Sequence, residues 1–498
     1  MCMFILVLAT AGVGWWFYER LNGKIHSVSL EGRGGAETAD AFGRKPINIL
    51  VMGSDGRTSK ADCKLGGGCA STGVQTGYGN ADVQMVVHIS ADRSNTTVMS
   101  IPRDTMTRIP SCNDEETHAS TAGYYGQINS ALQYGPACQV ATTHQLTRIP
   151  IDHFIKLDFS GVVKMSDAVG GVAVCVSDNV YDTYSHLKLS KGTHTLKGEA
   201  ALQFVRARHA FGDGSDLGRT RTQHLFLAAL LRKVKSTDLL THPTTLYSLA
   251  DAATRALTVD DGLGSIDKLI SLARDLNKVP AGRATFTTMQ SDPDPDDSNR
   301  VVPAPAAEKL FSAIAQDVPL STGSGKKSGK APATPSATTV PSSRIAVTVQ
   351  NGTSITGRAS AVAESLIGRG FSSATTASNA PGPAKATTLT YGPGREAEAR
   401  TVAAALGITG SHLKQGRDSR LTLVIGNDWP RGTGYPNEPT PPASALRNEA
   451  LADAHVFTAD RAASCAEVSR FATVNVNGVS MTPTQAYAAA REVPDSDS

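Results

Sequence analysis

The sequence lacks the features that mark a nucleic-acid-coating protein, a zinc site or a hydrolase with a nucleophilic triad. Its 498 residues carry a formal net charge of only +3, and Lys and Arg form no run, alone or interleaved with aromatic residues. A protein that coats nucleic acid needs such a basic surface, so any cationic site here is local. Neither GxSxG nor HExxH occurs, and no pair of CxxC motifs has zinc-site spacing. We therefore expect no nucleic acid partner and no enzyme of those classes.

One uncharged apolar stretch lies at the N-terminus. Residues 1–18, MCMFILVLATAGVGWWFY, end in an aromatic cluster of the kind found at membrane interfaces. A cleaved signal peptide is the alternative, but no basic segment precedes the apolar residues, and aromatic residues occupy the place of small cleavage-site residues. We predict an uncleaved single-pass anchor, one transmembrane helix at 1–18, followed by a juxtamembrane segment at 19–44.

Cysteine is scarce, and its positions bear on the side of the membrane where the protein lies. Cys63 and Cys69 flank the flexible KLGGG, and Cys112 and Cys138 enclose a loop-rich segment. Two extracellular disulfides are one interpretation, and unpaired thiols in a reducing compartment are the other. The positive-inside rule, applied to the basic residues after the anchor, places the body in the cytoplasm. We give the cysteines more weight and predict that residues 19–498 lie outside the cytoplasm.

Strand and helix patterns alternate through residues 45–290. Strand-like segments occur at 47–55, 83–90 and 95–104, in HFIKLDF and in VAVCV. A short helix follows HFIKLDF, and an apolar stripe predicts a long helix from about Gly218 to Ser236. This alternation indicates an α/β (α+β) domain.

The composition changes after this domain. Residues 291–343 are rich in Pro, Ser, Gly and Lys and are predicted to be a linker. Residues 344–428 alternate between strand and helix patterns and predict a small compact αβ domain. Residues 429–498 are polar and alanine-rich, contain the lone Cys465, and are predicted to be a mostly disordered tail with one weak helix.

Arginine is concentrated in the window FVRARHAFGDGSDLGRTRTQHLFLAAL. It contains Arg206, Arg208, Arg219 and Arg221 beside a Gly/Asp-rich turn. The planar guanidinium suits phosphate, and Arg219 shares a helix face with Gln223 near a helix N-terminus, where backbone N–H groups favour an anion. The window therefore predicts a phosphate site, with a surface salt-bridge cluster as the alternative.

Three other stretches end in residues of matching chemistry: GSDGR (53–57), NADVQ (80–84) and SIPRD (100–104). Asp55 and Asp82, with Asp104 or Asp216 as a further ligand, suit a hard divalent cation. The arginines suited to clamp a pyrophosphate are Arg57, Arg103, Arg206, Arg208 and Arg219. A metal ion and arginines together would stabilise the charge that develops on a transferred phosphoryl group.

Other polar groups in these stretches have simpler interpretations. His209 and His224 flank the arginines, and we interpret both as hydrogen-bonding neighbours rather than acid–base groups. No nucleophile of the usual kinds accompanies the arginines, so we expect no covalent enzyme intermediate. Direct attack by an acceptor hydroxyl, with an Asp accepting its proton, is the simpler mechanism.

Across residues 45–290 the sequence resembles the LytR-CpsA-Psr family of membrane-anchored bacterial enzymes. The family's motifs appear in order as NILVMGSDGR, ADVQMVVHIS, VMSIPRDT, INSALQYGPA, IPIDHFIKLDFSG, DAVGGVAVCV, GTHTLKGEAALQFVRARH and GDGSDLGRTRTQHLF. Residues 345–427 are similar to the LytR-type C-terminal domain that such proteins often carry, frequently in actinomycetes. Eight motifs in the right order make the resemblance specific.

The resemblance implies a mixed sheet flanked by helices, and a transferase that uses Mg²⁺ or Mn²⁺. Such an enzyme takes a glycopolymer with its phosphate from a polyprenyl-pyrophosphate carrier and attaches it to a muramic acid hydroxyl of peptidoglycan. Its partners are the carrier-linked glycan, peptidoglycan and the cytoplasmic membrane. Carried over by motif, Asp55 and Asp82 are the metal-associated carboxylates. The catalytic pyrophosphate clamp comprises Arg103, Arg206, Arg208 and Arg219, with Arg57 and Gln223 as further members.

Three positions depart from the family pattern. Asn80 stands in place of Arg, Gln127 in place of Lys, and Thr222 in place of Arg. At least two cationic contacts to phosphate are lost, each worth about 1.5 to 3 kcal/mol when well made. Two alternatives therefore stay open: a non-catalytic envelope scaffold or regulator that binds carrier lipid or peptidoglycan, and a polyprenyl-pyrophosphate pyrophosphatase.

Overall fold

A computed structural model describes most of the chain, in two compact units. The described residues are 18–36, 44–65, 69, 73–75, 77–212, 214, 216–235, 243–321, 341–408, 410–429, 433, 435, 443–452, 454, 456–460 and 465–497. One unit combines Met1–Gly323 with Ala443–Ser498, and the other is Ser324–Pro442. The predicted anchor lies outside the described residues except for Tyr18. Within the described part of the chain, no helix has the length and apolar character needed to cross a membrane.

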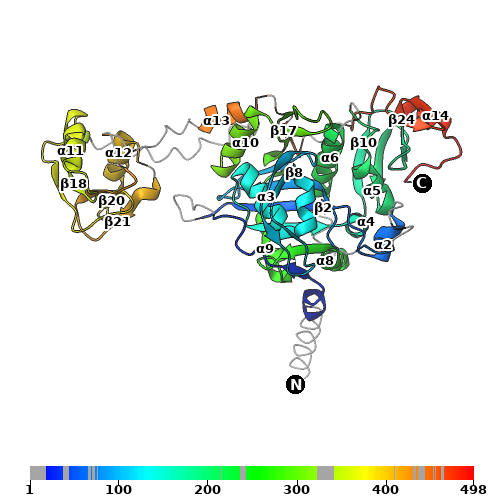
Figure 1. Cartoon of the computed structure of the whole chain (residues 1–498), viewed down its shortest axis with the longest axis horizontal. Helices are drawn as coiled ribbons and strands as arrows, with labels where there is room; N and C mark the ends of the chain where they lie inside the picture. Colours follow the sequence, from blue (N-terminus) through cyan, green and yellow to red (C-terminus); the bar gives the residue numbers. More distant parts are fainter. Residues whose placement is uncertain are drawn as a thin grey trace, which may run out of the picture. The chain divides into compact units, whose positions relative to one another are not determined.

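The first unit is built on an eight-stranded mixed sheet, which confirms the predicted α/β class (Figure 1). Its strands, in spatial order, are β1 (His26–Val28), β14 (Leu257–Asp260), β9 (His153–Leu157), β2 (Ile47–Ser54), β3 (Ala81–Ile89), β4 (Thr96–Ser100), β15 (Ala284–Thr288) and β23 (Phe457–Thr458). The central strand β3 runs antiparallel to both of its neighbours, β2 and β4. Further out, β9 is parallel to β2, and β15 is parallel to β4.

Both faces of this sheet are buried. Successive side chains of a strand point to opposite faces, so Leu50 and Met52 enter one core while Val51 packs against the other. Helices α3, α10 and α13 complete the core that contains Leu50, and α5 and α6 complete the core that contains Met85. The helices of this unit are α2 (Lys60–Lys64), α3 (Pro136–Thr147), α4 (Phe159–Ala168), α5 (Gly198–Arg206), α6 (Asp216–Lys235), α8 (Pro243–Ala256), α9 (Ile266–Lys278), α10 (Pro305–Ala315), α13 (Ala443–Ala450) and α14 (Pro483–Ala489).

Short two-stranded sheets and 3₁₀ turns surround the large sheet. The pairs are β5 (Met106–Ile109) with β8 (Tyr124–Gln127), β6 (Cys112–Asn113) with β7 (Ser120–Thr121), β10 (Val172–Val176) with β13 (Gly192–Leu196), β11 (Val180–Asp182) with β12 (Leu187–Leu189), β16 (Ser291–Pro293) with β17 (Val301–Pro303), and β24 (Val474–Val476) with β25 (Val479–Met481). The 3₁₀ turns are η1 (Ile128–Tyr134) and η2 (Ala281–Arg283).

The second unit has its own sheet and its own core. The sheet order is β19 (Thr376–Asn379), β18 (Val347–Asn351), β22 (Leu421–Ile425), β20 (Thr388–Tyr391) and β21 (Leu413–Gln415). Helices α11 (Arg358–Gly368) and α12 (Glu396–Leu406) and the 3₁₀ turns η3 (Ser342–Arg344) and η4 (Gly410–His412) accompany it. Val349, Leu423 and Trp429 are fully buried in a core drawn from this unit alone. A small αβ domain is what the alternating pattern predicted.

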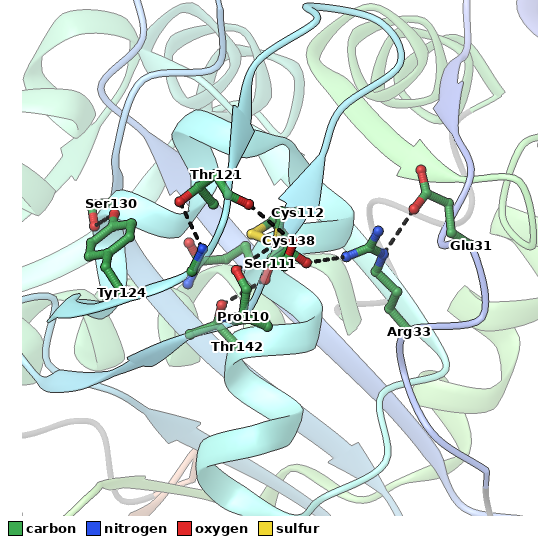
Figure 2. Close-up of a disulfide and its surroundings, with 12 residues drawn as sticks. Glu31, Arg33, Pro110, Ser111, Cys112, Thr121, Tyr124, Ser130, Cys138 and Thr142 are labelled. Atoms are coloured by element: carbon green, nitrogen blue, oxygen red, sulfur yellow. Dashed lines mark hydrogen bonds and ion pairs between the residues drawn. A yellow bond between two sulfur atoms is a disulfide. The ribbon is translucent and has the colours of Figure 1, made fainter.

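Three disulfides connect distant or looped segments of the first unit. The pairs Cys63–Cys69 and Cys112–Cys138 confirm the predicted pairing. Figure 2 shows Cys112–Cys138, which joins β6 to α3, where Thr142 Oγ1 donates a hydrogen bond to the Cys138 carbonyl at 2.8 Å. A loop of this length closed in the unfolded chain is expected to stabilise the fold by about 3 to 4 kcal/mol.

The chain after residue 290 is more ordered than its composition indicated. The first part of the predicted linker forms β16, β17 and α10, and α10 buries Leu310 in a core. Residues 322–340 of that linker lie outside the described residues. The predicted disordered tail instead contributes α13, β23 and α14, and Cys465, which looked unpaired, is bonded to Cys175. The disorder prediction was wrong because these short segments are stabilised by contacts with distant parts of the chain, which local composition does not reveal.

Candidate functional site

Two adjoining cavities hold all eight predicted site residues. The first, of about 480 Å³, is lined by Asp82, Arg103, Arg206, Arg208, Arg219 and Gln223 together with many apolar side chains. The second, of about 870 Å³, is lined by Asp55 and Arg57. Asp82, Phe159 and Arg206 line both, so the two form one continuous cleft. The predicted residues come from four separate stretches of the sequence, and the fold places them in one cleft.

The predicted metal carboxylates are positioned by the ends of two neighbouring strands. Because β2 and β3 are antiparallel, the end of β2 lies beside the start of β3, and Asp55 follows Ser54 at this edge. Asp55 Oδ1 accepts a hydrogen bond from the Asn80 backbone N–H at 2.6 Å. Asp82 Oδ1 accepts one from Arg103 Nη1 at 2.7 Å. Both carboxylates therefore keep a fixed place at the mouth of the second cavity.

Two guanidinium groups converge on the ring of Phe159. Asp158 caps α4 by accepting from the Gly161 backbone N–H, which fixes Phe159 as the first residue of the helix. Arg206 lies 4.6 Å and Arg57 5.1 Å from the ring centroid. Burial, and secondly the nearby charge of Arg57, lower the pKa of Arg206 below its ordinary value. Two cations held this close favour an anion between or beside them.

Backbone carbonyls near α2 orient the same pair. Arg57 Nη1 donates to the Asp62 carbonyl at 2.7 Å, and Arg206 Nη1 donates to the Leu65 carbonyl at 3.1 Å. Both acceptors lie within or beside the loop that the Cys63–Cys69 disulfide closes. The disulfide thus restricts the segment that aligns two of the predicted clamp residues.

Helix α6 supplies the opposite side of the cleft. Arg219 is buried, and its Nη2 donates to the Asp82 carbonyl at 3.2 Å. One turn later, Gln223 Nε2 donates to the Val205 carbonyl at 3.1 Å. Arg208 lies just after α5 and lines the first cavity. Arg219 and Gln223 lie in the N-terminal half of α6, where the backbone also favours an anion.

At the three departures from the family pattern, neutral side chains form hydrogen bonds. Asn80 Oδ1 accepts from Gln133 Nε2 at 2.8 Å, Gln127 Nε2 donates to Asp104 Oδ1 at 2.6 Å, and Thr222 Oγ1 donates to the Arg219 carbonyl at 2.8 Å. Arg300 Nη1 lies 3.4 Å from the same Asp104 oxygen. A cation therefore reaches Asp104 from the β16–β17 connection, which the sequence had placed in a linker.

Sequence reasoning missed Phe159, which lines the cleft, and Arg300, which contacts Asp104. Phe159 sits in the motif HFIKLDFSG, and an aromatic residue directly after a strand near arginines could have been noted as a cation–π partner. Arg300 gave no such signal, because nothing local connects it to Asp104, 196 residues away.

The two histidines differ in their surroundings. His224 is buried between Phe286 and Phe457, and its Nε2 shares a hydrogen bond of 2.6 Å with Ser100 Oγ. Burial lowers the pKa of His224 to about 3. His209 lines the first cavity, its ring stacks at 4.0 Å on Tyr184, and burial lowers its pKa too. His224 is therefore a neutral structural group, as interpreted from the sequence.

The buried His224 predicts a dependence of stability on pH. Its pKa in the folded protein lies below the unfolded value of 6.5, so the unfolded chain binds the proton more readily. The associated stability is complete above pH 6.5 and is lost as the pH falls toward 3. Between pH 6 and 4, the unfolding free energy of wild type should fall with decreasing pH more steeply than that of His224→Gln. We expect the two slopes to differ by up to about 1.4 kcal/mol per pH unit. Urea unfolding at several pH values measures this difference, and equal slopes would contradict it.

The carboxylates fit a divalent cation that is bound together with phosphate. Mg²⁺ in phosphate-handling sites is usually held by one or two carboxylates, with substrate phosphate oxygens and waters completing its shell. Asp55 and Asp82 both line the second cavity and supply two such groups. Among the described residues, no three His, Cys, Asp or Glu side chains are grouped to hold a metal ion. The donor set thus suits a metal shared with a ligand rather than one enclosed by protein.

Most side chains that line the first cavity are apolar. Val162 and Met165 of α4 face it, as do Phe226, Leu227 and Leu230 of α6. A hydrocarbon chain can lie along such a wall because each buried CH₂ contributes about 0.8 kcal/mol. The cleft therefore combines an apolar wall with a set of arginines, the combination needed to bind an amphiphile with an anionic head.

Sequence comparisons give the family. The LytR_cpsA_psr family model matches residues 21–314, and a model described as the LytR cell envelope-related transcriptional attenuator matches residues 344–429. Three curated relatives come from two bacteria. Cell wall biosynthesis protein LcpA of Corynebacterium glutamicum is 30% identical over 314 residues, 57% of this chain and 58% of that protein. The probable cell wall biosynthesis protein LcpB of the same organism is 32% identical over 274 residues, which are 54% of this chain and 60% of that protein.

The third relative is the polyisoprenyl-teichoic acid–peptidoglycan teichoic acid transferase TagT of Bacillus subtilis. It is 29% identical over 246 residues, 47% of this chain and 68% of that protein. The chain spans about three fifths of the length of the two corynebacterial relatives. Because the first family model covers more than half of its residues, the chain belongs to the LytR-CpsA-Psr family.

Proposed function

We propose that this protein transfers a glycopolymer, with its phosphate, from a polyprenyl-pyrophosphate carrier to a muramic acid hydroxyl of peptidoglycan. The observation that carries the proposal is the continuity of the cleft: an apolar cavity opens through Asp82, Phe159 and Arg206 into a polar one. A polyprenyl chain fits the first part, and the pyrophosphate and sugar fit the second. The relative TagT, named as a teichoic acid transferase, supports the same reaction class.

The arginines bind the pyrophosphate and hold it in one orientation. Arg206 and Arg57 approach from the Phe159 side, and Arg219 approaches from α6. In the proposed reaction the acceptor hydroxyl attacks the phosphorus that carries the sugar, and a new P–O bond forms. The P–O bond to polyprenyl phosphate breaks, and that phosphate leaves with the electron pair. The cations stabilise the charge spread over the phosphoryl oxygens, which is the main catalytic need of such a transfer.

Carboxylates of the cleft bind the metal ion and accept the proton. Asp55 and Asp82 would hold a Mg²⁺ or Mn²⁺ ion, which supplies Lewis-acid neutralisation of phosphate charge when bound. A carboxylate of the cleft accepts the proton of the attacking hydroxyl. Arg103 holds Asp82 at 2.7 Å and so keeps this carboxylate pointed into the cleft.

The same proposal places the protein in the cell envelope. The curated corynebacterial relative is named for cell wall biosynthesis, and three disulfides fit an oxidising compartment. We propose a single-pass anchor at 1–18, with the body of the protein outside the cytoplasm, facing the carrier lipid and peptidoglycan.

Metal removal tests the proposal. The full chain is incubated with Mg²⁺, a short polyprenyl-pyrophosphate oligosaccharide and peptidoglycan fragments, and phosphodiester-linked product is followed by mass spectrometry. We expect EDTA to reduce product at least about 100-fold, Mg²⁺ to restore it, and Asp82→Asn to require much more Mg²⁺ for half-maximal rate, because one ligand charge is lost. Equal rates with and without the metal would contradict the assigned role of Asp55 and Asp82.

The neutral side chains of Asn80 and Gln127 favour examining the two alternative functions in the same assay. Asn80 and Gln127 are hydrogen-bonded to Gln133 and Asp104. Carrier that binds without giving product indicates a binding scaffold, and product sugar that stays free indicates a pyrophosphatase. If Asn80→Arg and Gln127→Lys together convert an inactive protein into an active one, the natural chain is a binding member of its family.

A further inference from the structure

A segment of the C-terminal region lies against the loop that carries part of the proposed clamp. We call residues 465–473 the bracing segment and residues 207–212 the arginine loop. The loop directly follows α5, which ends at Arg206, and precedes α6, which begins at Asp216 and carries Arg219. It also contains Arg208, which lines the first cavity. Any change in the loop therefore acts on three arginines of the cleft.

Hydrogen bonds join the bracing segment to this loop along its length. The Ser469 backbone N–H donates to the Ala210 carbonyl at 2.8 Å, and the Gly212 N–H donates to the Glu467 carbonyl at 3.0 Å. Thr473 Oγ1 donates to the His209 carbonyl at 2.5 Å. The pairing of Phe211 with Val468 is an antiparallel β-bridge. The loop is thus paired as one strand is paired with another.

The opposite edge of the bracing segment is held by β10. The Ala466 N–H donates to the Cys175 carbonyl at 2.7 Å, and the Ser177 N–H donates to the Ala466 carbonyl at 3.0 Å. The Cys175–Cys465 disulfide fixes the start of the segment to the same strand. The segment therefore bridges β10 and the arginine loop.

The loop and the bracing segment are buried in one core. Ala210 and Phe211 are buried in the same core as Ala466 and Val468. Phe211 packs edge-on against Phe204 of α5, with ring centroids 5.5 Å apart. Without the bracing segment, Phe211 would lose apolar neighbours and the loop would lose three hydrogen-bond partners, so its conformation would no longer be unique.

We propose that the bracing segment is a positioning element of the anion clamp, locked by the Cys175–Cys465 disulfide. It makes no contact with the ligand itself; it fixes the arginine loop, and through it the relative places of Arg206, Arg208 and Arg219. The inference rests on the proposed function in that it takes the clamp to bind pyrophosphate. A clamp assembled this way is complete only when residues some 260 positions downstream have folded against it and their cysteine has been oxidised.

A pair of matched threonine variants tests the contact. Thr473→Val removes the hydroxyl that donates to the His209 carbonyl, and Thr484→Val removes one that donates at 3.0 Å to the Asn179 carbonyl, away from the arginine loop. In the full chain, we expect Thr473→Val to speed amide hydrogen exchange across 207–212 about five-fold. The Kd for inorganic pyrophosphate should rise by a similar factor, because one neutral hydrogen bond is lost. Thr484→Val should change neither quantity.

A pair of disulfide variants tests the lock. The double change of Cys175 and Cys465 to Ser is compared with the double change of Cys112 and Cys138 to Ser, which removes a disulfide outside the cleft. We expect both to lower the melting temperature, but only the first to raise the pyrophosphate Kd, by about ten-fold or more at a temperature where both are folded. An unchanged Kd in Thr473→Val and in the first disulfide variant would overturn the inference.

These measurements separate the inference from the proposed function. Pyrophosphate binding and hydrogen exchange need no transfer chemistry, so a wild type that binds and responds to the variants but forms no product would overturn only the transferase. A wild type that does not bind pyrophosphate would overturn the clamp, and with it the positioning role of the bracing segment.

Discussion

Replacing Arg219 with Ala should lower kcat/KM for transfer by about 100-fold or more, while the same change at Arg221 should stay within about two-fold. Arg219 is buried at the cleft, and its Nη2 contacts the Asp82 carbonyl at 3.2 Å. Arg221, on the same helix, has a side chain 60% exposed, and within the described part of the chain it pairs with Glu467 at 4.0 Å. Two charge-assisted contacts to phosphate, at about 1.5 to 3 kcal/mol each, account for the expected loss.

The comparison of the two arginines controls for charge and for helix propensity, since both variants remove one cation from α6. Arg219→Lys should recover part of the rate, because an ammonium keeps the charge but not the planar pair of donors. Melting temperatures and pyrophosphate Kd values distinguish a local loss of binding from a fold defect. Equal rates for Arg219→Ala and wild type would show that the buried guanidinium serves the fold and not the phosphate.

The cleft could be predicted from sequence to the extent that its chemistry is local. Asp55 directly follows β2, Asp82 is the second residue of β3, and Arg219 lies in the first turn of α6. Each therefore lies where short-range patterns place a functional group. Their convergence follows from strand register, which the alternating pattern of β2 and β3 implies. Arg300 could not be found this way, because its contact with Asp104 is made by a hairpin whose composition is that of a linker.

The C-terminal region shows the same limit more strongly. Its apolar residues are few and scattered, so the sequence indicated no more than one weak helix there. In the structure, Val468 and Phe457 nevertheless pack in a core formed by residues more than 150 positions earlier. A segment of this kind gains its stability from a surface that is already formed by the rest of the chain. Sequence patterns therefore predict the central strands of the sheet but not the strand β23 at its edge.

Deleting residues 443–498 should prevent the first unit from folding, whereas replacing residues 324–442 with a flexible Gly/Ser linker should leave it folded. The first deletion removes β23 from the edge of the large sheet, Leu446 from one core and Val468 from the other. Each large buried side chain contributes about 1.5 to 3 kcal/mol, and the disulfide that closes the long Cys175–Cys465 loop adds about 4 to 5 kcal/mol. Together these approach the whole stability of a typical domain.

The second change removes a unit whose core is its own, since the cluster around Val349 and Trp429 includes no residue of the first unit. We expect the melting temperature of the remaining unit to stay within about 2 °C of its transition in the full chain, because the described residues that form its cores all belong to that unit. Soluble yield, circular dichroism and calorimetry measure both outcomes. If the protein lacking 443–498 is soluble and unfolds cooperatively, the first unit does not need this region to fold. If the protein lacking 324–442 fails to fold, the stability of the first unit depends on the second unit.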